Sequence, residues 1–319
     1  MSVAVNTDDP SGIPKVALIA GPTASGKSAI ALALAKVMPV TIINADASQV
    51  YRDLRVLSAR PSESEEAQCH HRLFGYIDGA ESCSAARWAE DAKDAIEQSI
   101  GEGRLPVLVG GTGLYIRTLL TGIAPVPEIS PKIRDLVRSL DVTSAYDALR
   151  WEDPEAAVRL APTDTTRVAR ALEVVRATGR TLKEWQAELI GGIADQISLN
   201  ALLLLPPREW LVERCQKRLI AMFDDGGLEE VEQLVARRLS PMLPVMRAIG
   251  VGEISAWLCG EISREQALEA TNIATRQYAK RQSTWFRNQS PIGWKRVELL
   301  LSDDKFDEFV IKFQQSLLT

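Results

Sequence analysis

Four short, uninterrupted apolar runs are the clearest hydrophobic pattern in the chain. They lie at 15–20 (KVALIA), 40–44 (VTIIN), 105–109 (LPVLV) and 201–205 (ALLLL). Runs of this length without a polar face are typical of strands that are buried on both sides of a parallel sheet. Each of the first three leads into Gly or Ala-Asp, so we expect ligand-binding loops at the carboxyl ends of these strands.

Helical patterns separate these runs. Residues 28–37 are rich in Ala and Leu, and 84–100 have apolar residues at helical spacing before Gly101. Strands that alternate with helices predict a parallel α/β core. The strand pattern disappears between 126 and 192, which is charged, helical and punctuated by Pro, and helices dominate again from Glu209 onward.

The predicted domains follow from this change of pattern. We expect a flexible tail at 1–14, a core made of 15–125 and 193–319, and a helical insertion at 126–192. At roughly 150 residues per domain, the 319 residues fit two domains.

Composition narrows the class of protein. Apolar residues make up 46% and charged residues 25%, as in ordinary globular chains. No stretch approaches the roughly 18 apolar residues of a membrane span, and the polar start lacks the features of a secretory signal. The four cysteines form no C-x-x-C pair, which predicts a cytoplasmic protein without a disulfide framework.

The two histidines, His70 and His71, are adjacent and follow Cys69. Neighbouring residues rarely face one ion, so we do not expect a metal site there. With so little His in the chain, a general base is expected to be a carboxylate.

Charge is distributed unevenly. The net charge is −5, yet 270–297 contains no Asp or Glu. Its cations are Arg276, Lys280, Arg281, Arg287, Lys295 and Arg296. This stripe is either a site for one polyanion or a solvated helix face, and charge alone does not decide between them.

A phosphate-binding motif follows the first strand. The sequence GPTASGKS matches G-x-x-x-x-G-K-[ST] and lies between a predicted strand and a predicted helix. Backbone N–H groups, the helix dipole and the Lys27 ammonium favour a di- or triphosphate, and the Ser28 hydroxyl can ligate Mg²⁺. The expected binding residues are Gly21, Pro22, Thr23, Ala24, Ser25, Gly26, Lys27 and Ser28.

The acid that an ordinary nucleotide hydrolase needs is not where it is expected. The strand at 105–109 runs into GGTG without a carboxylate, whereas the strand at 40–44 is followed by Asp46. Asp46 is a metal-assisting residue, a general base or a strand-end cap, and the motif leaves all three open.

Taken in order, these segments resemble the bacterial tRNA dimethylallyltransferase (tRNA isopentenyltransferase) family. After GPTASGKS come ADASQVYR at 45–52, the His pair, and LPVLVGGTGLYI at 105–116. EDPEAA, DTTRVARALEV, RLIAMFDDGGLEEV and AKRQSTWFR then follow in the family order. The resemblance implies an α/β fold, with a P-loop NTPase-like parallel sheet core flanked by helices, a helical insertion domain and a helical C-terminal region.

The resemblance also implies a reaction. Dimethylallyl diphosphate would donate its five-carbon group to N6 of the adenosine that is 3′-adjacent to the anticodon, in tRNAs reading codons that begin with U. Diphosphate would be released. The expected cofactor is Mg²⁺, the expected partner is the tRNA anticodon stem-loop, and the chain would be a cytoplasmic monomer with no membrane and no obligate protein partner.

Roles for residues are carried over from the matching family positions. Asp46 would be the general base, Thr23, Lys27 and Arg218 would act on the diphosphate, and Ser28 would hold the metal. For Arg218, a surface salt bridge is the alternative. The implied tRNA contacts are Asp46, Ala47, Ser48, Gln49, Thr112, Arg134, Thr166, Arg167, Arg170, Arg247, Gly250, Lys280, Arg281, Gln282, Thr284 and Arg287.

The stretch 263–287 opens with a capping box of Ser263 and Gln266. If it is one helix, Arg276, Lys280 and Arg287 fall within about 40° of one another and Trp285 lies opposite. We therefore expect phosphate contacts on the basic face and core packing for the indole, although Trp285 belongs to a motif that contacts tRNA.

The chain departs from the family pattern at three places. Ala47 replaces the usual Ser, Leu57-Ser58-Ala59-Arg60 replaces Gly-Thr-Ala-Lys, and Gly250-Val251-Gly252-Glu253 replaces Gly-Tyr-Lys-Glu. We interpret these as divergence without loss of activity. The rival hypotheses are a small-molecule or nucleoside kinase, an enzyme that prenylates free adenine nucleotides, and a non-catalytic tRNA-binding switch.

Overall fold

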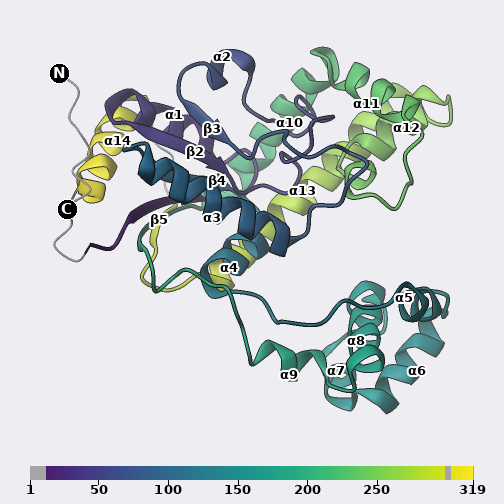
Figure 1. Ribbon diagram of the computed structural model, residues 1–319. Coiled ribbons are helices and arrows are strands. Elements are labelled where there is room, and N and C mark those ends of the chain that lie inside the picture. Colours follow the sequence, from purple (N-terminus) through teal and green to yellow (C-terminus); the bar gives the residue numbers. More distant parts are fainter. Residues whose placement is uncertain (1–11, 299–302, 319) are drawn as a thin grey trace. The chain divides into compact units, whose positions relative to one another are not determined.

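The computed structural model describes residues 12–298 and 303–318. In that part of the chain, six parallel strands form one sheet in the order β3-β2-β4-β1-β5-β6 (Figure 1). The strands are β1 Lys15–Ala20, β2 Val40–Asn44, β3 His70–Arg72, β4 Leu105–Gly110, β5 Ser198–Leu204 and β6 Lys295–Val297. The parallel α/β core expected from the sequence is confirmed.

The four central strands coincide with the four apolar runs. Every residue of β2 and β4 is buried, because helices cover both faces of the sheet. The sequence analysis missed the edge strands β3 and β6. Each has three residues of which two or three are charged or polar, so neither contains an apolar run that would predict a strand.

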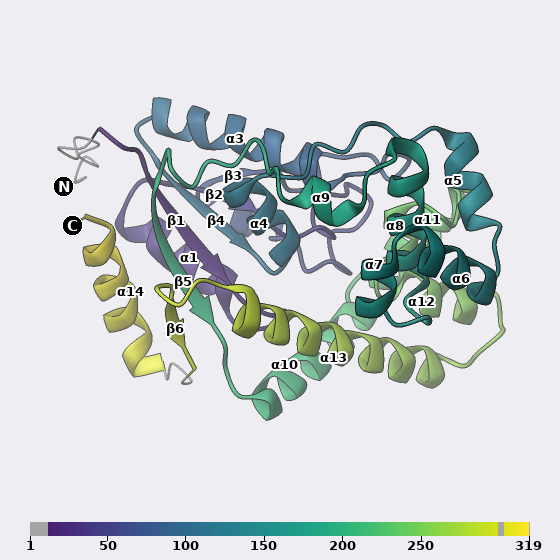
Figure 2. The same cartoon turned by 90° about the horizontal axis from the view of Figure 1, so that it is seen from below.

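Helices α1 (Lys27–Val37) and α3 (Ala85–Gly101) cover opposite faces of the sheet (Figure 2). The two crossovers are made in opposite directions along the strand order, so right-handed connections place their helices on opposite sides. On the α1 face, helix α14 (Asp303–Leu318) completes a core that includes Ile30, Leu34 and Phe313.

The remaining helices of the core follow β5. They are α10 Arg208–Asp224, α11 Gly227–Ala236, the 3₁₀ turn η1 Pro244–Arg247, α12 Val251–Leu258 and α13 Arg264–Gln289. Two shorter helices, α2 Glu63–Glu66 and α4 Gly113–Thr121, lie earlier in the chain. As expected from the sequence, Ser263 caps α13 through a capping box with Gln266. None of the described helices has the length and apolar character that crossing a membrane requires.

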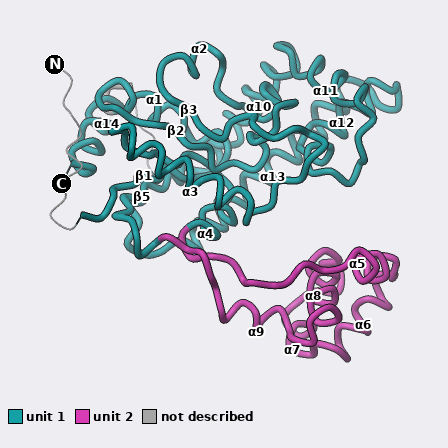
Figure 3. The backbone as a smooth tube through the Cα atoms, viewed as in Figure 1, with its two compact units in different colours: residues 1–119, 194–319 teal, residues 120–193 magenta. Residues whose placement is uncertain are grey.

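The chain divides into two compact units (Figure 3). The first comprises Met1–Leu119 and Ala194–Thr319, and the second comprises Leu120–Ile193, against the range 126–192 expected for the insertion. The second unit holds α5 Pro131–Arg138, α6 Val142–Glu152, α7 Pro154–Arg159, α8 Thr165–Thr178 and α9 Leu182–Gln186.

The second unit has its own small core. Val137, Leu149, Val168 and Leu172 pack together at its centre. The two chain segments that lead into and out of this unit pair with each other, because Ile123 and Ile190 exchange backbone hydrogen bonds of 2.9 and 3.1 Å.

Candidate active site

A cavity of about 1080 Å³ lies in the first unit, where the carboxyl ends of β1, β2 and β4 meet. One part of its wall is formed by residues 23–29, which contain the phosphate-binding motif, and another by residues 46–49. Residues of α10 and α13, together with residues 57–59 and part of 244–249, line the remaining sides. The loops that follow separate strands therefore meet around one space, as expected for the ligand site of a parallel sheet.

The phosphate-binding loop has the backbone shape that its glycines permit. Gly26 precedes α1 with φ +93°, a left-handed conformation that a residue with a side chain adopts only with strain. The Lys27 ammonium donates to the Pro22 carbonyl at 2.7 Å, and Ser28 is exposed on the cavity wall. The loop thus presents the N-terminus of α1, an ammonium and a hydroxyl to the same space.

Two cations are desolvated at this end of the cavity. Burial lowers the pKa of Lys27 to about 8, although the nearby Asp46 carboxylate acts in the opposite direction. Burial also lowers the pKa of Arg218, whose guanidinium donates to the Thr23 hydroxyl of the loop. Arg218, on α10, is therefore in contact with the phosphate-binding loop, and among the described residues it has no salt-bridge partner. Two neighbouring half-buried cations favour an anionic ligand, because such a ligand removes their mutual repulsion.

The lowered pKa of Lys27 predicts how kcat/KM depends on pH. Lys27 attracts an anionic substrate only when it is protonated, so kcat/KM for such a substrate should fall above pH about 8, approaching about tenfold per pH unit. A bound anion raises the pKa of Lys27, so kcat should stay level to a higher pH than kcat/KM. Initial rates at limiting and saturating substrate, measured from about pH 7 to pH 10, test both statements.

A Lys27→Arg variant is the control for this pH profile. The guanidinium stays charged beyond pH 12, so the variant should lack the decline at alkaline pH whatever its absolute activity. A wild-type kcat/KM that is flat across the whole pH range would contradict the role of Lys27 as the cation that attracts the substrate.

Asp46 is held in place by its neighbours at the end of β2. Its Oδ1 accepts hydrogen bonds from Ser48, at 3.0 Å from the backbone N and 2.7 Å from the hydroxyl. The buried Asn44 accepts from the backbone N–H of Asp46 at 2.8 Å and donates to its carbonyl at 3.0 Å. Thr112, after β4, accepts from the backbone N–H of Ala47 at 2.9 Å. The carboxylate therefore has a fixed position on the cavity wall.

The glycines after β4 allow the two strand ends to approach. A side chain at Gly110 would have its Cβ 2.1 Å from the backbone of Ala45, so only glycine fits there. The neighbouring Gly111 accepts at 2.9 Å from the carboxamide of Gln282, whose oxygen accepts from the backbone N–H of Thr23 at 2.7 Å.

Gln282, expected to contact tRNA, lies inside the protein. It is 5% exposed, and both ends of its amide form hydrogen bonds to the protein. Through these two hydrogen bonds, Gln282 connects α13 to the phosphate-binding loop and to the end of β4.

The other predicted residues of α13 lie on two faces of the helix. Arg281 lines the main cavity. Lys280, Thr284 and Arg287 line a second groove of about 470 Å³ between α10 and α13, together with Arg276. Trp285 packs against Gly113 at the start of α4, as expected for an indole opposite the basic face.

Of the two predicted tRNA contacts near η1, one lines the cavity and the other is buried. Arg247 is exposed and lines the main cavity. Gly250, also expected to contact tRNA, is buried, and its N–H and carbonyl bond to Glu253 and Ile254. With φ +96°, Gly250 forms the turn before α12.

Four predicted tRNA contacts belong to the second unit. Thr166, Arg167 and Arg170 are exposed near the start of α8, and Arg134 is half-buried on α5. Arg167 and Arg170 have ion-pair partners in Asp164 and Glu173.

Sequence reasoning missed two residues of the main site. Asn44 was taken only as the end of an apolar strand, although a buried amide before an acid is itself a signal. Tyr278 lines the cavity, and burial together with the Asp46 carboxylate raises its pKa. Its position within a basic helix gave no indication of this location.

The Cys69, His70 and His71 segment lies at the sheet edge, away from these residues. His71 Nδ1 is 2.9 Å from the Cys69 carbonyl, and His70 lies near Glu102 at 3.8 Å. In the described part of the chain, no group of three or more His, Cys, Asp or Glu residues is arranged to hold a metal ion.

The fold and the loop define an α/β protein of the P-loop class whose cavity suits a phosphorylated ligand. Comparison with known proteins identifies the family more closely. Residues 49–289 match the model of the IPP transferase family. The chain is 60% identical to a tRNA dimethylallyltransferase of Sphingopyxis alaskensis over 95% of its length and 100% of the relative, and 57% identical to one of Erythrobacter litoralis over 89% and 92%.

Solved structures agree with this comparison. A full-length tRNA isopentenylpyrophosphate transferase of Bacillus halodurans is 30% identical, with 95% of this chain and 97% of that chain covered and a TM-score of 0.67. A eukaryotic dimethylallyltransferase studied while acting on tRNA is 30% identical over 85% and 69%, with a TM-score of 0.73. The chain belongs to the IPP transferase family.

Proposed function

We propose that this protein transfers a dimethylallyl group from dimethylallyl diphosphate to N6 of the adenosine 3′-adjacent to the anticodon of tRNA. The observation that carries the proposal is a single cavity in which two desolvated cations and a fixed carboxylate face the same space. A phosphorylated electrophile needs the cations, and an acceptor that must lose a proton needs the carboxylate. The relatives named tRNA dimethylallyltransferase support the same substrates.

The donor end of the cavity acts on the leaving group. As the bond between the allylic carbon and the diphosphate oxygen breaks, negative charge grows on that oxygen. Lys27, Arg218 and the N–H groups at the start of α1 are already in place to stabilise this charge. Arg218 also donates to the Thr23 hydroxyl, which fixes the position of this hydroxyl in the loop.

The acceptor end of the cavity acts on the nucleobase. The exocyclic amine of adenine is a weak nucleophile, because its lone pair is delocalised into the ring. In the proposed step N6 forms a bond to the allylic carbon, its proton passes to Asp46, and diphosphate departs with the bonding electrons. A stacked base cannot reach this carboxylate, so the adenosine must be extruded into the cavity.

The residues also fit a Mg²⁺ ion. Ser28 offers an exposed hydroxyl beside the phosphate-binding loop, and hydroxyl and phosphate oxygens are ligands that Mg²⁺ prefers. When bound, the ion would add positive charge at the leaving diphosphate. We propose Ser28 as its protein ligand.

The proposal extends to where and how the protein works. With tRNA as the substrate, we propose a cytoplasmic enzyme that acts on tRNAs reading codons beginning with U. The residues proposed for the donor end and for the base belong to one unit of one chain, so a monomer without a protein partner suffices for the chemistry.

Mass analysis tests the proposed function. Anticodon stem-loops carrying the acceptor adenosine are incubated with the protein, Mg²⁺ and dimethylallyl diphosphate, and a gain of one C5H8 unit at that adenosine is expected. A stem-loop with guanosine at the same position is the matched control and should stay unmodified. Production of ADP from ATP and a small alcohol, with no modified nucleoside, would instead establish a kinase.

A further inference from the structure

Glu230, on α11, grips a loop that is far from it in sequence. Its Oε1 accepts from the backbone N–H groups of Arg55 and Val56, each at 2.7 Å, and its Oε2 accepts from that of Leu57 at 3.0 Å. One carboxylate thus satisfies three consecutive N–H groups across more than 170 residues of chain. Neither the phosphate-binding motif nor the proposed chemistry uses this residue.

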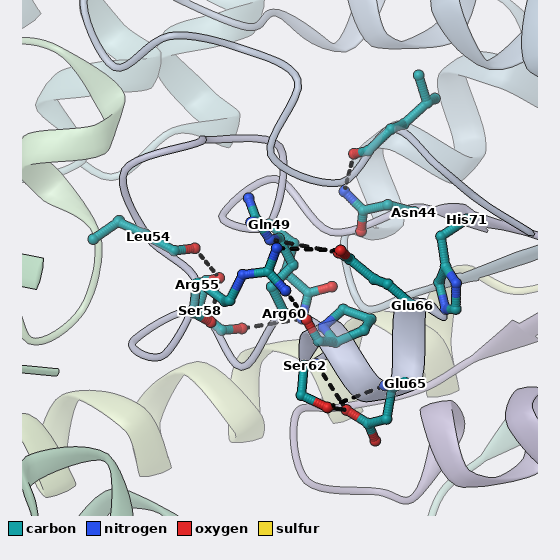
Figure 4. Close-up of polar contacts among 12 residues, drawn as sticks. Asn44, Gln49, Leu54, Arg55, Ser58, Arg60, Ser62, Glu65, Glu66 and His71 are labelled. Atoms are coloured by element: carbon teal, nitrogen blue, oxygen red, sulfur yellow. Dashed lines mark hydrogen bonds and ion pairs between the residues drawn. The ribbon is translucent and has the colours of Figure 1, made fainter. Parts of the chain in front are cut away.

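The same loop is tied on its other sides (Figure 4). The Ser58 hydroxyl donates to the Leu54 carbonyl at 2.6 Å. The Arg55 guanidinium donates to the Pro61 carbonyl at 2.8 Å and to Glu66 at 3.1 Å. These contacts make the loop a fixed part of the wall, and Leu57, Ser58 and Ala59 line the main cavity.

The loop in turn orients Gln49, which lines the same cavity. The Gln49 amide nitrogen donates to the carbonyls of Ser58 and Ala59 at 3.0 and 2.9 Å (Figure 4). Both partners are carbonyl oxygens that can only accept, so the nitrogen end of the carboxamide must face them. Among the described residues none donates a hydrogen bond to the remaining oxygen, Oε1, which is therefore available as an acceptor.

We propose that Glu230 is a positioning residue for the acceptor nucleobase, acting through residues 55–59 on Gln49. The carboxylate holds the N–H side of the loop, the loop carbonyls hold the Gln49 amide, and Gln49 Oε1 is presented as a hydrogen-bond acceptor. The group that it fits is the exocyclic amine of a purine, which adenine has at C6 and guanine lacks there. The inference rests on the proposed function, because it assigns this wall to the acceptor adenosine.

A Glu230→Gln variant tests the proposal. The amide puts an NH2 group where the carboxylate accepts, so at least one of the three N–H groups loses its partner. We expect KM for tRNA to rise about tenfold, corresponding to about 1.4 kcal/mol, while the affinity for inorganic diphosphate stays within about twofold of wild type. Steady-state prenylation gives the first quantity and calorimetry with inorganic diphosphate gives the second.

Glu229→Gln is the matched control. Glu229 is the neighbouring residue on α11, is exposed and is removed from the loop contacts, so its variant should behave as wild type. Glu230→Asp keeps the charge on a shorter side chain and should lose less tRNA affinity than Glu230→Gln. If Glu230→Gln does not fold, the comparison of Glu230→Asp with Glu229→Gln decides the same question.

A double-mutant cycle distinguishes positioning from general support of the fold. If Glu230 acts through Gln49, then Glu230→Gln combined with Gln49→Ala should raise KM for tRNA less than the product of the two single effects. Independent effects, or an equal loss of diphosphate affinity, would overturn the proposal.

Hydrogen exchange tests the contact apart from catalysis. The peptide containing residues 55–57 should exchange faster in Glu230→Gln than in Glu229→Gln. Unchanged exchange would refute the role of Glu230 in holding residues 55–57, whether or not the protein prenylates tRNA. An absence of prenylation by the wild-type protein would refute the proposed function. The exchange result would still show whether Glu230 holds this loop.

Discussion

Replacing Asp46 with Asn is expected to lower the turnover of tRNA prenylation by about 10²- to 10⁴-fold, the usual contribution of a positioned general base. The amide keeps an oxygen for the two Ser48 contacts, so the loop should keep its conformation. KM for the donor should change little, because the phosphate-binding loop is untouched. Single-turnover transfer of labelled dimethylallyl groups to tRNA measures the chemical step directly.

Asp94→Asn provides the control for the loss of one carboxylate. Asp94 is exposed on α3 and is not part of the cavity wall, so its variant should match wild type. An Asp46→Asn protein that transfers the group within about threefold of the wild-type rate would show that another residue, or water, removes the proton.

Replacing Lys27 with Ala should have the second large effect. The change removes a half-buried cation where, in the proposed reaction, charge develops on the leaving diphosphate, and the loss of one such group costs about 10²- to 10³-fold in turnover. Inorganic diphosphate should also bind more weakly, because the variant loses the Lys27 charge and keeps only that of Arg218 next to the loop. Turnover assays and calorimetric titration with diphosphate measure the two effects.

Lys36→Ala is the comparison variant, since Lys36 is exposed on the same helix. It should retain wild-type turnover and diphosphate binding. Native diphosphate affinity in Lys27→Ala would contradict the placement of the diphosphate in the loop and would require a different site for the donor.

The features that the sequence predicted are those encoded locally. Residues 21–28 form the phosphate-binding loop because its glycines, its lysine and the following helix are contiguous. The carboxylate after β2 was identifiable because an acid at the end of a buried strand contrasts with its apolar neighbours. The face of α13 that carries Arg276 and Lys280 also followed from helical periodicity alone.

The features that the sequence did not predict depend on contacts between distant segments. Gln282 was assigned to tRNA binding because its neighbours in the motif are basic, whereas its partners lie 171 and 259 residues away. The Glu230 contacts with the loop are of the same kind. Periodicity reports which side of an element is buried, but it does not report which buried groups meet.

Edge strands were missed for a related reason. β3 and β6 pair with strands that supply the apolar surface, so their own three residues need not be hydrophobic. Their pairing is stabilised by backbone hydrogen bonds, which leave no trace in the pattern of side chains.

The paired segments at Ile123 and Ile190 bear on how this architecture could arise. A reciprocal hydrogen-bonded pair keeps its two Cα atoms only about 5.5 Å apart, so the helical unit begins and ends at almost one point. A tight turn of a few residues would bridge the same gap. Insertion or deletion of these seventy or so residues during evolution would therefore leave the order and connections of the strands unchanged.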